Sequence, residues 1–282
     1  MNYANYSSIS VACKGGVMWV TIDHPPLNVL DAVLMPELDD LAVKVAKDES
    51  IQVIVFQSAD PDFFLVHGDM KLANDPEALS KMINQSLEDV GNEPLNQMLQ
   101  LHERIRALPQ LTIGKIAGLA RGGGAEFLSA LDMRFAAIGK AGLAQMETLV
   151  GLIPGAGGIA YLPQLVGRSR ALEIITGAAL FGAEEAEQYG WVNKALPANE
   201  LDDYVEELVR NISKRAPGVV RAIKQAIDVS TPDLSESLKF SNRLLGEIIA
   251  RPKTHELAQA ALAAGIQTRE VEMNLEKYLA DI

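Results

Sequence analysis

The sequence predicts an α/β fold, because short apolar runs alternate with amphipathic helical stretches over the first two-thirds of the chain. The β-branched run QVIVFQ at 52–57 indicates a buried strand, and the stretch before it, 31–47, has the spacing of an amphipathic helix. From residue 201 onward the pattern becomes helix upon helix. We therefore expect an α/β core at 1–197 and a helical region at 198–282.

The remaining strands and helices are predicted from the same two patterns, short apolar runs for strands and amphipathic spacing for helices. Gly15-Gly16 separates two short strand patterns and indicates a hairpin. The region 70–100 is acidic and weakly periodic, which is typical of helix and loop. We expect strands at 8–14, 17–23, 111–117, 133–138 and 191–196, and helices at 101–108, 126–131 and 268–279.

Composition excludes several classes of function. The single cysteine, Cys13, rules out an internal disulfide framework and fits a reducing compartment. Signal-peptide features and an apolar run of ~18 residues are both missing, so we expect a cytoplasmic protein without a membrane partner. The net charge of −12 disfavours binding to nucleic acid, since a polyanion is repelled at long range.

Three consecutive glycines, 122–124, stand between an apolar run and a helical pattern, with Glu126 two residues beyond them. The dinucleotide motif G-x-G-x-x-G fails because its third position is Phe127, and the P-loop Lys-Ser/Thr pair is missing. A glycine turn at a helix start still offers free N–H groups that hold a developing oxyanion. Alternatively, the glycines only let strand and helix pack closely.

Further motifs favour the oxyanion interpretation. ARGGGAEF at 120–127, AQMETLVGLIPGAGG at 144–158 and the segment at 176–197 occur in an order that resembles the crotonase superfamily, the enoyl-CoA hydratases and isomerases. HPPLNVLD at 24–31 and FFLVHGDM at 63–70 are similar to the family's early segment and oxyanion loop. The resemblance covers nearly all of the chain.

The resemblance implies a crotonase-like ββα spiral core at 1–197 that carries a thioester site. The backbone amides of Gly68 and Gly123 would form the oxyanion hole, and Glu126 and Glu147 would be the catalytic carboxyl groups. The substrate would be an acyl-CoA thioester, with CoA as part of the substrate, no separate cofactor and no metal. The helical region would form a homotrimer or a dimer of trimers.

The implied activity is that of an acyl-CoA lyase, which hydrates a 2-enoyl-CoA to a 3-hydroxyacyl-CoA. Glu147 would transfer the proton at Cα, and Glu126 would orient and activate water. An enoyl-CoA isomerase, or other thioester enolate chemistry, needs only one of the two carboxyl groups and is the alternative. A non-catalytic CoA-binding protein would need neither of them.

Two residues depart from the family pattern. His67 stands where the family has a small residue, and it either packs the loop or adds an acid–base group beside the thioester as a modulator. Arg121 replaces an apolar residue before the glycines, and the sequence assigns it no role. The other histidines, His24, His102 and His255, are expected to be solvated or capping residues.

Overall fold

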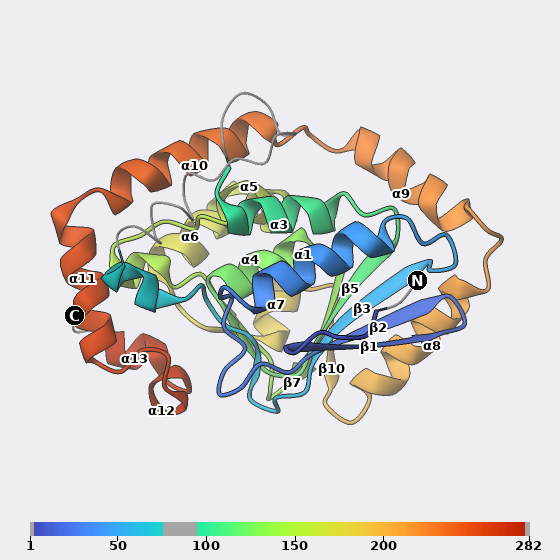
Figure 1. Ribbon diagram of the computed structural model, residues 1–282, viewed down its shortest axis with the longest axis horizontal. Helices are drawn as coiled ribbons and strands as arrows, with labels where there is room; N and C mark the ends of the chain where they lie inside the picture. Colours follow the sequence, from blue (N-terminus) through green and yellow to red (C-terminus); the bar gives the residue numbers. More distant parts are fainter. Residues whose placement is uncertain (1–2, 76–94, 280–282) are drawn as a thin grey trace.

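A six-stranded sheet lies at the centre of the computed structural model, which describes residues 3–75 and 95–279 (Figure 1). The two N-terminal strands pair antiparallel as the predicted hairpin, and the other neighbours in the sheet are parallel. The α/β prediction is therefore confirmed. In sheet order the strands are β1 (Ile9–Lys14), β2 (Val17–Ile22), β3 (Val53–Ser58), β5 (Leu111–Ile116), β7 (Met133–Ile138) and β10 (Lys194–Pro197).

A second, smaller sheet was not predicted, because its strands are only two or three residues long. In the chain its strands alternate with those of the large sheet: β3 is followed by β4, β5 by β6, and β7 by β8. Each turn of the chain thus adds one strand to each sheet. The four strands, in sheet order, are β4 (Phe63–Leu65), β6 (Leu119–Arg121), β8 (Gly142–Ala144) and β9 (Phe181–Gly182).

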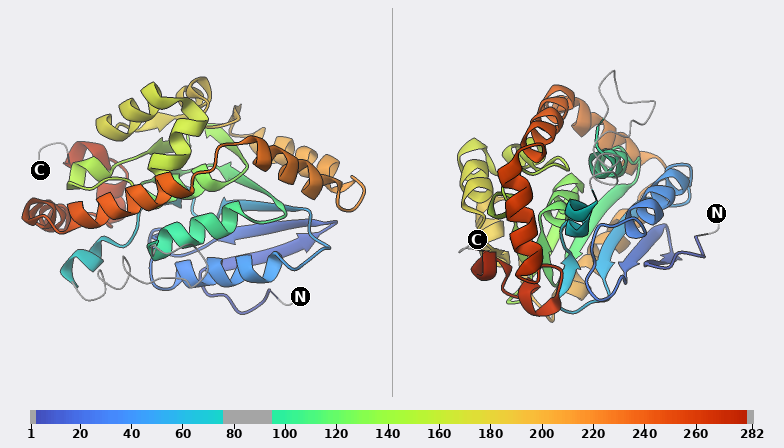
Figure 2. Two further views of the ribbon diagram at one scale, coloured as in Figure 1. Left: turned by 90° about the horizontal axis from the view of Figure 1, so that it is seen from above. Right: turned by 60° about the vertical axis from the view of Figure 1, so that its left-hand side comes forward.

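Helices cover both faces of the large sheet and then surround the core. In Figures 1 and 2, α9, α10 and α11 follow one another around the outside, and α12 and α13 lie beyond α11 near the C-terminal end. The core helices are α1 (Leu34–Val45), η1 (Met70–Asn74), α3 (Gln97–Arg106), α4 (Gly123–Ala130), η2 (Glu147–Val150), α5 (Gly158–Val166), α6 (Arg168–Gly177) and α7 (Ala183–Tyr189). The later ones are α8 (Leu201–Ser213), α9 (Val219–Ser230), α10 (Ser235–Ile249), α11 (Pro252–Ala263), α12 (Arg269–Glu272) and α13 (Leu275–Leu279).

Strand β3 shows how the sequence builds the two layers. Its side chains alternate in direction, as the period of a strand requires. Val53 and Val55 pack in the cluster that contains α8, whereas Ile54 and Phe56 pack in the larger cluster that contains α1 and α4. Because β3 is covered on both faces, its sequence is a continuous apolar run without the polar alternation of a half-exposed strand.

Three helix predictions are corrected by the structure. Helix α3 begins at Gln97, four residues before the predicted start, because the Asn96 side chain caps it by accepting from the Leu99 N–H. Helix α4 begins at Gly123, within the glycines. The predicted helix at 268–279 is broken into α12 and α13, and Glu272 at the end of α12 contacts His67 of the core.

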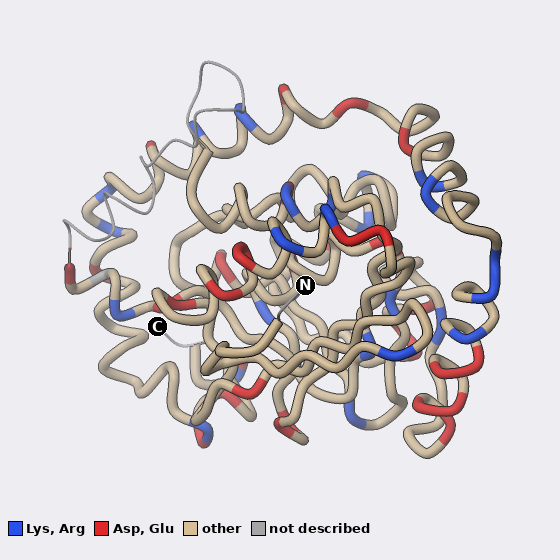
Figure 3. Tube along the Cα trace, turned by 45° about the vertical axis from the view of Figure 1, so that its right-hand side comes forward, with Lys and Arg blue, Asp and Glu red and all other residues tan. Residues whose placement is uncertain are grey.

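Three further expectations concern the region 70–100, membrane spans and the distribution of charge. Much of the region 70–100 lies outside the described residues. Within the part that the structure describes, no helix has both the length and the apolar character that crossing a membrane requires. In Figure 3, Lys and Arg are interspersed with Asp and Glu along the trace, and no long basic run is visible in this view.

Gly124→Ala tests the close approach of α4 to β4. A Cβ at position 124 would lie 1.8 Å from the carbonyl oxygen of Leu65, so the helix or the strand must move. Overpacking of this kind costs about 1–3 kcal/mol, and here we expect the upper part of that range in thermal unfolding. The matched control is Gly177→Ala in α6, where an added Cβ meets nothing within 4 Å. Equal melting temperatures for the two variants would contradict the prediction.

Candidate active site

The small sheet brings the predicted site residues together. Strands β4, β6 and β8 are adjacent and parallel, so the loops that follow them leave from the same edge. Gly68 follows β4, Gly123 follows β6, and Glu147 follows β8. Residues that are far apart in sequence therefore meet at the carboxyl ends of three neighbouring strands, where α/β folds commonly place their ligands.

The three glycines of the turn allow this close meeting. Gly122 has φ of +47°, a conformation that side chains other than glycine rarely adopt. A Cβ at Gly123 would lie 3.6 Å from the Gly68 nitrogen and 2.7 Å from the Met98 sulfur. The two residues predicted to form the oxyanion hole are therefore neighbours in space, with Met98 packed against them.

The backbone around Gly68 is fixed on both sides. Leu30 donates from its N–H to the His67 carbonyl at 3.2 Å and accepts from the Asp69 N–H at 3.1 Å. Both hydrogen bonds involve residues next to Gly68, His67 on one side and Asp69 on the other. Neither of them uses the Gly68 N–H. At Gly123 the N–H belongs to the first turn of α4, where amides have no intrahelical acceptor.

Glu126 lies on α4 and is 2% exposed. Its Oε1 accepts hydrogen bonds from the N–H groups of Ala156 at 2.8 Å and Gly158 at 2.7 Å. Burial raises the pKa of Glu126 to about 7, although these backbone N–H groups act in the opposite direction by favouring the carboxylate. The side chain can therefore hold or release a proton near neutral pH.

Glu147, at the start of η2, is buried without this support. Neither of its carboxyl oxygens has a hydrogen-bond partner among the described residues. Burial raises its pKa well above the ordinary value of 4.5, and the negative charge of Glu126 raises it further. Burial therefore favours the protonated form more strongly at Glu147, and Glu126, with its two N–H donors, is the better carboxylate.

Helix α3 holds the loop that supports Glu126. The Asn96 amide donates to the Gly155 carbonyl at 2.6 Å, and His102 Nδ1 pairs with the Ala156 carbonyl at 2.8 Å. His102 is fully buried, and burial lowers its pKa to about 4, so the ring is neutral and Nδ1 donates. The expectation that His102 is solvated or capping is therefore wrong. Sequence spacing gave no signal for either contact.

A largely apolar cavity of about 160 Å³ opens onto both glutamates and both glycines. Helices α10 and α11 contribute part of its wall, so the two sheets and their helices do not enclose the cavity by themselves. Representative apolar lining residues are Met70, Leu72, Val150, Leu152, Leu245 and Ile249.

The two residues that departed from the family pattern are both buried next to the site. His67 also lines the cavity, but its ring is engaged at both nitrogens, with the Gly68 carbonyl at 2.7 Å and Glu272 at 2.9 Å. Burial opposes the charge of His67, yet the neighbouring Glu272 carboxylate raises its pKa above 6.5. Arg121 forms a two-pronged ion pair with Glu276 at 2.6 and 2.9 Å.

Two interleaved sheets, with paired glycine amides and two buried carboxyl groups at one edge, define a crotonase fold. The chain belongs to the enoyl-CoA hydratase/isomerase family, whose sequence profile matches residues 12–263. The predicted superfamily is thereby confirmed.

Individual relatives agree with this assignment. The short-chain-enoyl-CoA hydratase of Clostridium acetobutylicum is 28% identical over 92% of this chain and 94% of its own length. The carnitinyl-CoA dehydratase of Proteus mirabilis is 28% identical over 81% and 82%. A crystal structure of a Streptomyces avermitilis protein, provisionally named an enoyl-CoA hydratase, has 43% identity and a TM-score of 0.91 over 98% of both chains.

Glu147→Gln should stabilise the protein at alkaline pH and not at acidic pH. Above pH 4.5 the unfolded chain ionises Glu147, whereas the folded chain keeps the proton, so folding stability falls as pH rises through this window. Glutamine resembles the protonated acid and removes that loss. We expect a higher melting temperature at pH 8, with roughly 2–4 °C for each kcal/mol gained, and no gain at pH 4.

The exposed Glu206 of α8 provides the matched control, since Glu206→Gln changes the same group in water. A gain for Glu147→Gln that is equal at pH 4 and pH 8 would show that ionisation of this carboxyl is not the cause.

Proposed function

We propose that this protein hydrates a 2-enoyl-CoA thioester to a 3-hydroxyacyl-CoA. The observation that carries the proposal is the buried pair Glu126 and Glu147 beside two glycine amides, in which two backbone N–H groups support the carboxylate of Glu126 and none supports that of Glu147 among the described residues. A carboxylate and a carboxylic acid at one site are the base and the acid that hydration needs.

In the proposed reaction, the thioester oxygen lies between the N–H groups of Gly68 and Gly123. Glu126, as the carboxylate, takes a proton from water while the water oxygen bonds to Cβ. The C=C electron pair moves onto the thioester as an enolate, whose negative oxygen the two amides stabilise. One such donor typically contributes ~10²–10³ in rate.

Glu147 then gives its proton to Cα, and the enolate electrons form the new C–H bond. The product carries the OH group of the water at Cβ and the hydrogen from Glu147 at Cα. The pair now has its proton on Glu126, and transfer of that proton back to Glu147 restores the starting state. The arrangement thus supports the division of roles that the sequence suggested.

The relatives support this reaction class in different degrees. Two that align along most of the chain are named as a hydratase and a dehydratase of CoA thioesters, which are lyase reactions. The apolar cavity wall suits an acyl chain. CoA as part of the substrate, without a separate cofactor, and a cytoplasmic location remain proposals that rest on the sequence.

The direct test follows the loss of the conjugated thioester absorbance with short and medium 2-enoyl-CoA esters. Glu126→Gln and Glu147→Gln should each lower kcat by about 10²–10⁴, because each removes a proton-transfer group. Parallel assays with 3-enoyl-CoA esters test the isomerase alternative, in which only one of the glutamates would matter. Lack of turnover of every 2-enoyl ester would refute the hydratase proposal.

We also propose that the protein assembles as a homotrimer or a dimer of trimers. Helix α9 buries only Val220 and Lys224. Its residues Val219, Ile223 and Ile227 are 42–56% exposed and recur every four positions, which forms an apolar stripe on one helix face. Such a stripe is unfavourable in water and is typical of an interface.

Light scattering tests the assembly. We expect three or six chain masses for the natural protein and a smaller assembly for Ile223→Glu/Ile227→Glu, since two buried charges would oppose association. Gln225→Glu changes an exposed residue of the same helix, away from this stripe, and should leave the mass unchanged. A mass of one chain for the natural protein would refute the proposal.

A further inference from the structure

A short C-terminal segment contacts every loop that carries a predicted site residue. This segment, residues 267–276, contains α12 and the start of α13 and is called here the C-terminal clamp. It pairs with His67 beside Gly68, with Arg121 before Gly123, and with η2, which begins at Glu147. The clamp therefore bridges the three loops that leave β4, β6 and β8.

The first contact is a buried ion pair next to the Gly68 amide. His67 Nε2 lies 2.9 Å from Glu272 Oε1, with side-chain exposures of 4% and 0%. The same oxygen accepts from the Gln267 N–H at 3.0 Å, which fixes the carboxylate within the clamp. Through Nδ1, the ring also bonds the Gly68 carbonyl. One side chain thus links the clamp to the residue whose N–H is predicted to bind the thioester.

The second contact lies two residues before Gly123. The Arg121 side chain is fully buried, and three of its N–H groups are directed into the clamp. Nε and Nη2 pair with the two oxygens of Glu276, and Nη1 donates to the Glu272 carbonyl at 2.8 Å. A planar guanidinium with bidentate pairing defines an orientation, which a flexible apolar side chain would not do.

The third contact is apolar and reaches the Glu147 loop. Val271 and Leu275 of the clamp pack in one cluster with Met146 and Val150, which stand on either side of Glu147. The clamp thus contacts the Glu147 loop through apolar side chains, whereas its ion pairs with His67 and Arg121 lie beside the two glycine amides.

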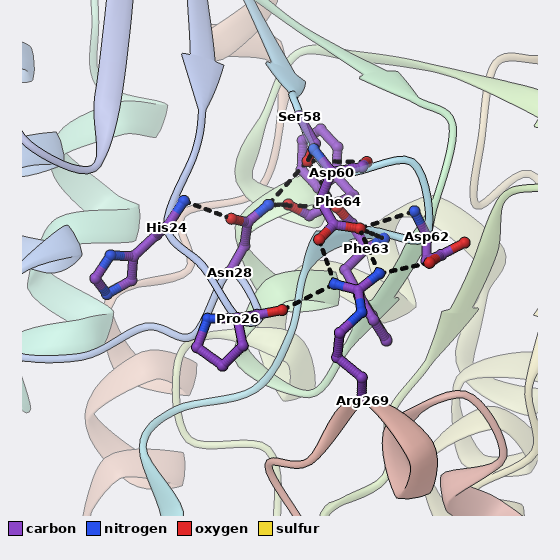
Figure 4. A network of polar contacts seen from close by, with 9 residues as sticks. All are labelled: His24, Pro26, Asn28, Ser58, Asp60, Asp62, Phe63, Phe64 and Arg269. Carbon is purple, nitrogen blue, oxygen red and sulfur yellow. Dashed lines mark hydrogen bonds and ion pairs between the residues drawn. The ribbon is translucent and has the colours of Figure 1, made fainter.

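Arg269 anchors the start of the clamp to the loop before β4. In Figure 4 its guanidinium meets the carboxylates of Asp60 and Asp62 and the carbonyl of Pro26. The guanidinium also lies 4.9 Å from the ring centre of Phe63, the first residue of β4. Both ends of the β4 region are thereby attached to the same segment.

We propose that His67 and Arg121 are positioning residues, which use the C-terminal clamp to hold the Gly68 and Gly123 amides at the spacing that an enolate oxygen requires. The inference rests on the proposed function in that it takes these amides as the oxyanion hole. The role proposed for both residues is to hold position, because the ring nitrogens of His67 and the guanidinium of Arg121 are directed to protein partners. Misplacement of such donors by a fraction of an ångström lowers their effect on a developing charge.

The test uses acetoacetyl-CoA, whose enolate absorbs in the near ultraviolet and is stabilised by an intact oxyanion hole without turnover. The natural protein should bind it and increase the enolate absorbance. Arg121→Met, His67→Gln and the milder Glu276→Gln should each reduce the enolate fraction at saturation by about 10-fold, because the donors lose their alignment. Glu276 is partly exposed, so its variant keeps the proposal testable if the buried variants do not fold.

The matched control is Lys224→Met. Lys224 is also buried and ion-paired, with Asp132 at 2.8 Å, and attaches a C-terminal helix to the core without touching the glycine loops. Its variant should lose stability but keep the enolate band. A band that falls equally in this control, or that persists in all three clamp variants, would overturn the inference.

The enolate band also separates this inference from the proposed function. A normal band in the natural protein, a loss in the clamp variants and no hydration of any 2-enoyl ester would refute the hydratase and support the clamp. Lack of the band in the natural protein would refute the oxyanion hole and, with it, the clamp.

Discussion

The burial of two carboxyl groups beside one another is the constraint on which the rest of the site depends. A carboxylate removed from water is unfavourable unless N–H groups replace the lost hydration. Glu126 receives two such groups from the loop at 155–158, whereas Glu147 receives none from the described residues, and burial raises its pKa well above the ordinary value. The difference between the two carboxyl groups is thus produced by the backbone, and the backbone is held in turn by Asn96 and His102 of α3.

The charged side chains around the two glutamates form ion pairs with one another. His67, Arg121, Glu272 and Glu276 bring four further ionisable groups close to the glutamates. Buried ion pairs contribute little net stability, but removal of one partner costs about 3–5 kcal/mol, because a charge is left without compensation. We therefore infer that these ion pairs act here mainly by fixing orientation. They fix where the glycine loops lie, at a place where apolar packing would leave the amide orientation less defined.

The sequence predicted the parts of the site that are local in the chain. The glycines at 122–124 followed by Glu126 predict amides and a carboxyl group at one helix start, and the structure brings Gly68 next to Gly123. The strands of the large sheet could also be predicted, because they are long apolar runs. Strands β4, β6 and β8 could not be predicted, since three residues are too few to show a periodicity. The partner of Arg121 lies 155 residues further along the chain, and no spacing rule connects the two.

The short strands are nevertheless what makes the site possible. A glycine turn, an acidic residue and a histidine loop can act together only if their backbones leave one edge side by side, and β4, β6 and β8 provide that edge. Three-residue strands fix few hydrogen bonds, so this edge needs support from outside the sheet. Gly124 lets α4 pack directly on β4, and the C-terminal clamp ties the three loops together from the other end of the chain. The geometry at the candidate site is consequently determined also by the C-terminal helices, and not by the glycine motif alone.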